Sequence, residues 1–124
     1  MDHSAGTWFL DNLDTILNKG LECKLRGVNN SYCYIGSWKS LFCWHKEDLD
    51  LSAINYLHYG KPKFWYCIQM DDGSILERET KKYFYGGFEK CPQYLRHKTS
   101  LVNPYLLKKN NPSLRITKTM QNEN

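Results

Sequence analysis

The sequence lacks the features that define several classes of protein. No apolar run in its 124 residues approaches the roughly 20 residues of a membrane-spanning helix. The opening residues, 1–4, do not follow the pattern of a secretory signal peptide. The five cysteines are an odd number, which without such a signal favours a reducing compartment over a disulfide framework. We therefore expect neither a membrane protein nor a secreted, disulfide-bonded domain.

Familiar catalytic and zinc-binding patterns are missing as well. No Ser–His–Asp or Cys–His arrangement for nucleophilic catalysis stands out, and no set of cysteines and histidines completes a tetrahedral zinc site. The chain has no internal repeat and no segment with the composition of an interdomain linker. Its aromatic residues follow strand periodicity and form no stacking platform, so sequence-specific nucleic-acid binding is not expected.

What the chain does contain is the triplet His45-Lys46-Glu47, in a stretch rich in strand-forming residues. On a β-strand, residues i and i+2 point to the same side, so the imidazole and the carboxylate can reach one metal ion. With a second histidine from elsewhere, they would make the triad of two histidines and one carboxylate that holds ferrous iron. The same spacing also arises by chance, and the two side chains then form an exposed pair.

Two runs after this triplet have the composition of buried strands, residues 53–58 and residues 63–68. The first run contains Asn55, and the second begins with Lys63. A lysine followed by Phe64 and Trp65 needs an anion or a path to water. The simpler alternatives are a solvated Lys63 and an Asn55 that caps a turn.

The segment 27–68 closely resembles the Jumonji C (JmjC) histone lysine demethylases. The motifs that carry this resemblance are Trp-His-Lys-Glu at residues 44–47 and Lys-Phe-Trp-Tyr at residues 63–66. Within the family, the segment is most similar to the subfamily that acts on trimethylated lysine nine and lysine thirty-six of histone H3. A looser resemblance extends over residues 8–117.

This resemblance implies an oxygenase that depends on Fe(II) and on 2-oxoglutarate. His45 and Glu47 would be iron ligands, and Glu47 is therefore also counted as catalytic. Lys63 would pair with the carboxylate of 2-oxoglutarate remote from the metal, while Asn55 would donate a hydrogen bond near its metal-chelating end. The apolar walls of the same pocket would be supplied by Phe42 and Trp65.

The resemblance further implies a methyl-lysine pocket lined by oxygen atoms. The matching groups are the Gly27 carbonyl, the Tyr34 hydroxyl and the Glu47 carboxylate, and Tyr34 is the second residue expected to be catalytic. Weak C–H···O contacts from the polarised methyl groups would aim one methyl at the iron. The alternative for Tyr34 is an ordinary strand tyrosine.

Cys91 and His97 resemble the half-site that supplies two ligands to a structural zinc in this subfamily. Structural zinc takes four nitrogen or sulfur ligands, and in the family the other two are cysteines farther downstream. The remaining cysteines of the chain do not occupy matching positions. The sequence therefore predicts a zinc half-site, with half of the zinc ligands absent.

The predicted fold class is mainly β with flanking helices. It is part of the double-stranded β-helix, the jelly-roll or cupin-like barrel of JmjC domains, truncated before the late strands. We expect residues 1–124 to be the N-terminal part of one catalytic domain, because the family's second iron-binding histidine lies on a later strand. The predicted parts are a polar tail (1–7), a helix (8–20), core strands with the His-x-Glu motif (27–70), a helical insert with the zinc half-site (74–110) and a polar tail (117–124).

Within the insert, the helical pattern covers residues 74–83, 91–97 and 103–110. Gly86-Gly87 and Asn103-Pro104 are expected to interrupt it.

The predicted function is demethylation of a trimethylated histone H3 lysine, with hydroxylation of one N-methyl group and release of formaldehyde. The expected partner is the methylated H3 tail or the nucleosome, and the expected location is the nucleus. The net charge of +4 and the pI near 8.8 are compatible with chromatin. The alternative is a truncated, catalytically inactive isoform that acts at most as a histone-binding or partner-binding module.

Overall fold

The computed structural model describes residues 10 and 14–123, and the chain divides into two compact units, residues 1–40 and 41–124. Each unit is described by itself. The first contains helix α1, Ile16–Gly20. Thr15 has an extended backbone and its hydroxyl accepts a hydrogen bond of 3.1 Å from the backbone N–H of Asn18, so it caps the helix. Of the helix predicted over residues 8–20, the described residues contain the α-helical part Ile16–Gly20, and residues 8, 9 and 11–13 lie outside the described residues.

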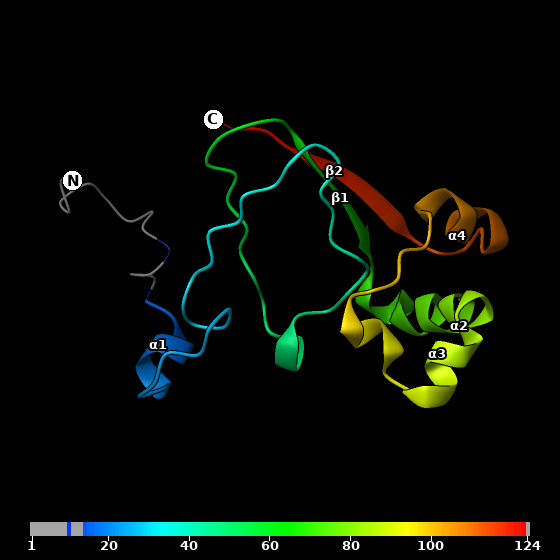
Figure 1. Cartoon of the computed structure of the whole chain (residues 1–124), viewed down its shortest axis with the longest axis horizontal. Coiled ribbons are helices and arrows are strands. Elements are labelled where there is room, and N and C mark those ends of the chain that lie inside the picture. The colour runs from blue at the N-terminus through cyan, green and yellow to red at the C-terminus, as the bar shows by residue number, and fades with distance from the viewer. Residues whose placement is uncertain (1–9, 11–13, 124) are drawn as a thin grey trace. The chain divides into compact units, whose positions relative to one another are not determined.

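The second unit is organised by a two-stranded antiparallel sheet (Figure 1). Strand β1, Lys63–Ile68, pairs with strand β2, Ile116–Gln121. The register places Lys63 opposite Gln121 and Ile68 opposite Ile116. Because side chains alternate along a strand, Lys63 and Trp65 lie on one face of the sheet, and Phe64 lies on the other.

Strand β2 corrects the expectation of a polar tail over residues 117–124, because residues 117–121 form most of this strand. The expectation of a buried strand over residues 53–58 is also wrong. That segment pairs with no strand in the described part of the chain, and all of it except Leu57 is exposed. Of the core strands predicted over 27–70, only β1 is present among the described residues. A strand persists where a neighbour satisfies its backbone groups, and β2 does this for β1.

Three helices of the second unit lie near one end of the sheet (Figure 1): α2, Gly73–Tyr83; α3, Tyr85–Lys90; and α4, Pro104–Asn110. Short 3-10 turns, η3 (Met70–Asp72) and η4 (Tyr94–His97), accompany them. Gly86 and Gly87, expected to interrupt the helical pattern, lie inside α3 instead. The helix expected over 91–97 is reduced to η4. None of the helices in the described residues is long and apolar enough to cross a membrane.

Asn103 and Pro104 start α4 in the way that their chemistry favours. The Asn103 side-chain oxygen accepts a hydrogen bond of 2.9 Å from the backbone N–H of Tyr105. Pro104 occupies the first turn, where a missing N–H costs nothing. Leu107 follows one turn later and is fully buried. The cap therefore fixes where α4 enters the core.

The core lies where the helices meet the sheet. Its fully or almost fully buried members are Val102, Leu107 and Leu114, and half-buried apolar side chains pack around them. Trp44 is one of these, and its indole N–H donates a hydrogen bond of 2.8 Å to the Val102 carbonyl. Burying the ring while satisfying its one donor is the usual way to accommodate tryptophan in a core.

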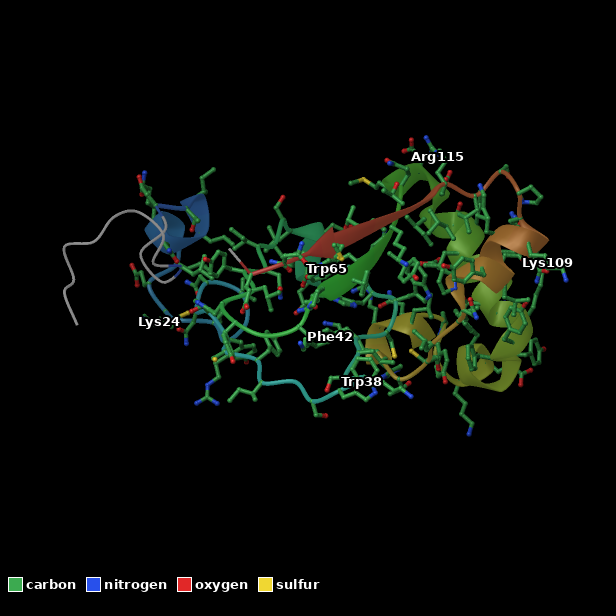
Figure 2. All side chains as sticks on the ribbon, turned by 90° about the horizontal axis from the view of Figure 1, so that it is seen from above. Lys24, Trp38, Phe42, Trp65, Lys109 and Arg115 are labelled. Carbon is green, nitrogen blue, oxygen red and sulfur yellow. The ribbon has the colours of Figure 1, made fainter. Side chains whose placement is uncertain are left out.

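A buried carboxylate joins the start of the helices to the start of β2. Asp72 accepts hydrogen bonds from the Arg115 backbone N–H (3.0 Å), Nε (2.9 Å) and Nη2 (3.0 Å). Figure 2 shows Arg115 where the ribbon of β2 begins. The hydrogen bonds from the Arg115 side chain, and next the one from its backbone, lower the pKa of Asp72 from 3.8 to about 2. Folding therefore favours the ionised carboxylate.

We predict that Asp72 makes the second unit sensitive to acid. Its contribution to stability is complete above the unfolded pKa of 3.8 and is lost as the pH falls through the folded pKa of about 2. Asp72→Asn should lower the urea midpoint at neutral pH, and the difference from wild type should shrink between pH 4 and pH 2. Urea titrations followed by tryptophan fluorescence at several pH values would measure this.

The matched control is Asp71→Asn. Asp71 lies 3.7 Å from Arg115 Nη2, but its side chain is 89% exposed, so its loss should have little effect. Equal effects of the two variants at neutral pH would contradict the role given to Asp72.

Candidate functional site

His45 and Glu47 lie close together, as their spacing predicted. The distance between His45 Nε2 and Glu47 Oε1 is 3.9 Å. The two residues belong to a segment without ladder partners, so the β-strand on which the prediction relied is absent, and the 3.9 Å separation itself shows that the side chains meet. The imidazole is mostly covered, with 22% of its side chain exposed, and the carboxylate is half-exposed at 46%. This pair is the half of the candidate site that the sequence predicts to bind a metal.

The hydrogen bonding of His45 determines which ring nitrogen can bind a metal. Its Nδ1 is 2.6 Å from the Cys43 carbonyl oxygen, which can only accept, so Nδ1 carries the proton. Nε2 then has a lone pair on the side of Glu47. Metal-ligating histidines usually donate their other ring N–H to such an acceptor. Two neighbouring ligands of one ion, with bonds of about 2.1 Å at right angles, lie roughly 3 Å apart, so these two atoms would have to approach each other to hold iron together.

Trp44 fixes the position of this pair relative to the core. Its side chain packs on the core cluster and bonds to the Val102 carbonyl, and His45 follows it directly in the chain. Burial of the Trp44 ring and its hydrogen bond therefore anchor the chain directly before His45.

Lys63 lies in a cluster with the other residues expected to bind 2-oxoglutarate. Its Nζ is 5.2 Å from the centre of the Phe42 ring and 4.7 Å from that of the Trp65 ring, and it donates a hydrogen bond of 3.1 Å to Asn55 Oδ1. Figure 2 labels Phe42 and Trp65 in this part of the molecule. We call Phe42, Asn55, Lys63, Trp65 and Gln121 the Lys63 cluster.

The Lys63 ammonium is partly desolvated. Burial lowers the pKa of Lys63 from its ordinary value of 10.5. Ring faces attract a cation but cannot replace its hydration, so the group retains a demand for an anion. Asn55 Oδ1 already accepts from Lys63, which leaves the Nδ2 group of Asn55 as the end of that side chain that can donate.

Phe42 connects the two halves of the site. Its ring centre is 6.4 Å from that of His45 and 5.2 Å from Lys63 Nζ. The residues expected to hold iron and those expected to hold 2-oxoglutarate therefore share one apolar neighbour.

Gln121 was missed by sequence reasoning. Its Oε1 accepts a hydrogen bond of 3.2 Å from the Trp65 indole N–H, and its Nε2 donates one of 2.9 Å to the Asn55 carbonyl. It lies in the stretch that was expected to be a polar tail. The available signal was the alternation of apolar and β-branched residues over 116–120, which favours a strand.

Gly27 and Tyr34 belong to the first unit, and Glu47 belongs to the second. Gly27 has φ +75°, and a Cβ there would lie 2.9 Å from the Tyr32 ring, so only glycine fits without strain. The Tyr32 and Tyr34 rings meet edge to face at 6.0 Å. The methyl-lysine pocket predicted from these residues stays a prediction.

Cys91 and His97 both lie in the second unit. Cys91 is half-buried and caps the C-terminus of α3, and His97 is the last residue of η4. Over residues 10 and 14–123, no three His, Cys, Asp or Glu side chains gather in a way that could hold a metal ion. The zinc half-site also stays a prediction.

Comparison with known proteins identifies the family of this chain. The family model described as "JmjC domain, hydroxylase" matches residues 32–124. The chain belongs to the JmjC domain family. The cupin-like fold class expected from the sequence is confirmed at this level, although the described JmjC residues include only the strands β1 and β2.

Curated JmjC relatives carry demethylase names. The chain is 46% identical over 120 residues to lysine-specific demethylase 4B of Mus musculus, covering 94% of this chain and 11% of that protein. It is 45% identical over 112 residues to the probable lysine-specific demethylase 4F of Homo sapiens (88% and 18%). It is 42% identical over 120 residues to lysine-specific demethylase 4D of Rattus norvegicus (94% and 24%). The chain thus spans between 11% and 24% of the length of these relatives.

We predict that Phe42→Ala raises the pKa of Lys63 toward 10.5, because water then reaches the ammonium. An NMR titration of the Lys63 side chain would measure the change. The control is Phe64→Ala, since the Phe64 ring lies under Lys118 Nζ (4.9 Å) on the other face of β1. A Lys63 pKa that stays constant or falls in Phe42→Ala would reject burial as the cause.

Proposed function

We propose that this chain forms part of a histone lysine demethylase that uses Fe(II) and 2-oxoglutarate. The observation that carries the proposal is the meeting of two chemically different halves at Phe42. The His45 ring, whose Nε2 is 3.9 Å from Glu47 Oε1, has its centre 6.4 Å from that of Phe42. The partly desolvated Lys63 ammonium lies 5.2 Å from the centre of the same Phe42 ring. A small molecule with a chelating end and a distant carboxylate matches both halves.

Each side chain has a role that its chemistry suits. His45 Nε2 and a Glu47 oxygen would hold the iron, and Lys63 would pair with the distant carboxylate of 2-oxoglutarate. The Asn55 Nδ2 group would donate to the chelating end, while Phe42 and Trp65 would exclude water from between. When bound, the iron supplies the oxidative chemistry: 2-oxoglutarate and dioxygen give succinate and carbon dioxide, and one N-methyl group is hydroxylated and leaves as formaldehyde.

The proposed substrate is a trimethylated lysine of histone H3, at lysine nine or lysine thirty-six, on the H3 tail or the nucleosome. The names of the relatives support a lysine demethylase. The Glu47 carboxylate would orient the methylammonium group by weak C–H···O contacts, and the Gly27 carbonyl and the Tyr34 hydroxyl stay candidates that the family resemblance alone implies. A protein that acts on this substrate would work in the nucleus.

Cys91 and His97 would contribute two of the four ligands of a structural zinc. Zinc held in this way would tie the end of α3 to η4. It would have no part in the oxidative chemistry.

A second candidate is a catalytically inactive isoform that binds a histone or another partner. What favours it is the number of metal-binding side chains, because His45 and Glu47 have no third such residue beside them in the described part of the chain. Two protein donors hold iron less firmly than three, and 2-oxoglutarate would have to complete the site.

The deciding experiment measures binding of Fe(II) and 2-oxoglutarate to the purified chain under reducing, anaerobic conditions. We expect iron to bind more tightly when 2-oxoglutarate is present, because the cosubstrate supplies further donors. His45→Ala should weaken iron binding by about tenfold or more. Lys63→Ala should weaken 2-oxoglutarate binding by roughly 10- to 100-fold, the usual worth of a charge-assisted hydrogen bond.

Two matched variants control for non-specific effects. His58→Ala removes an exposed histidine whose ring centre lies 4.9 Å from that of Tyr56. Lys118→Ala removes a lysine that, like Lys63, lies over aromatic rings. Neither should change binding. Absence of iron and cosubstrate binding in the wild-type chain would contradict the proposal and support the inactive isoform.

A further inference from the structure

We propose that Gln121 is a positioning residue for the cosubstrate site, which holds Asn55 and Trp65 in place around Lys63. This inference rests on the proposed function, because it assigns a role within the same site. Gln121 itself contacts neither the His45–Glu47 pair nor, in the proposed arrangement, the cosubstrate.

The contacts of Gln121 close a ring of interactions. Lys63 bonds to the Asn55 side chain, and the Asn55 carbonyl bonds to Gln121 Nε2. Gln121 Oε1 bonds to the Trp65 indole, and the Trp65 ring lies against Lys63. Lys63 and Gln121 are also direct partners across the sheet. A closed ring restricts each member more than a single contact would, because movement of one residue strains two others.

The chemistry of this position selects an amide side chain. The Trp65 indole N–H can only donate and the Asn55 carbonyl can only accept, so the bridging group must offer one acceptor and one donor. These two partners also fix which end of the amide is oxygen and which is nitrogen. A carboxylate could satisfy Trp65 but not Asn55, and a thioether could satisfy neither well.

The ladder between β1 and β2 does not restrain the segment that contains Asn55, and Gln121 bonds to that segment. Asn55 belongs to the exposed segment that pairs with no strand in the described residues, so its backbone depends on side-chain contacts. A second tether holds that segment farther along, where Glu123 Oε2 accepts a hydrogen bond of 2.6 Å from the Gly60 N–H. Loss of Gln121 should therefore release Asn55 and Trp65 without releasing the whole segment.

This arrangement makes a specific prediction for Gln121→Met, which keeps the length of the side chain and removes both hydrogen bonds. Affinity for 2-oxoglutarate should fall roughly five- to tenfold, while affinity for Fe(II) alone should not change. The control is Thr117→Val, an exposed position on the same strand and the same face, which should change neither affinity. Isothermal titration of the purified chain would measure both ligands.

Gln121→Glu separates positioning from stability. It keeps the acceptor for Trp65 but loses the donor to Asn55, so its urea midpoint should stay nearer to that of wild type than the Gln121→Met midpoint does. Its affinity for 2-oxoglutarate should still be reduced. Equal loss of iron and cosubstrate affinity in both variants, in step with the loss of stability, would show a merely structural role and overturn the inference.

A measurement without cosubstrate distinguishes this inference from the proposed function. Releasing Trp65 lets water reach the Lys63 ammonium, so an NMR titration should show a Lys63 pKa nearer to 10.5 in Gln121→Met than in wild type. Thr117→Val should leave it unchanged. If wild type fails to bind 2-oxoglutarate, the proposed function fails. If the Lys63 titration is the same in Gln121→Met and wild type, the positioning role fails, whatever the ligand binding shows.

Discussion

The pairing of β1 with β2 is the interaction on which the second unit depends. At one end, Ile68 and Ile116 lie opposite each other and pack against the core beside the helices. At the other end, Lys63 lies opposite Gln121 and the Lys63 cluster forms. The same short ladder therefore packs against the core at its Ile68–Ile116 end and supports the candidate site at its Lys63–Gln121 end. A shift in register by one residue would move Lys63 and Trp65 to the other face.

Trp44 anchors the segment that contains the His45–Glu47 pair, as the strand pair anchors Lys63. The segment around it has no ladder hydrogen bonds, so the buried indole and its bond to Val102 provide the anchor. The two halves of the site are thus anchored in different ways: Lys63 belongs to a strand pair, and His45 follows a buried aromatic residue. The Phe42 ring lies near both His45 and Lys63.

Sequence reasoning predicted the helices better than the strands, for a physical reason. Helix starts are encoded locally, as with Asn103 and Pro104 at α4. A strand depends on a partner that can be distant in the chain, so the composition of residues 53–58 could not show that they lack one. The same dependence on a distant partner explains β2, whose polar residues have the composition of a tail.

In the candidate site too, local relationships were predictable from the sequence and long-range ones were not. The convergence of His45 and Glu47 was predictable from their spacing alone. The grouping of Lys63 with Asn55, Phe42 and Trp65 came from resemblance to a family, since no local pattern links residues this far apart. Gln121 could be found only from the structure, because its role comes from its partners across the sheet.

The ladder between β1 and β2 closes a loop that contains all of α2, α3 and α4. Bringing the ends of a long loop together costs chain entropy, although the cost grows only slowly with length and is reduced when helices shorten the loop. Helices formed by local contacts can precede such a closure, whereas the Lys63 cluster cannot. The candidate chemistry therefore exists only in molecules that have completed this long-range step, and local opening of one strand is enough to dismantle it.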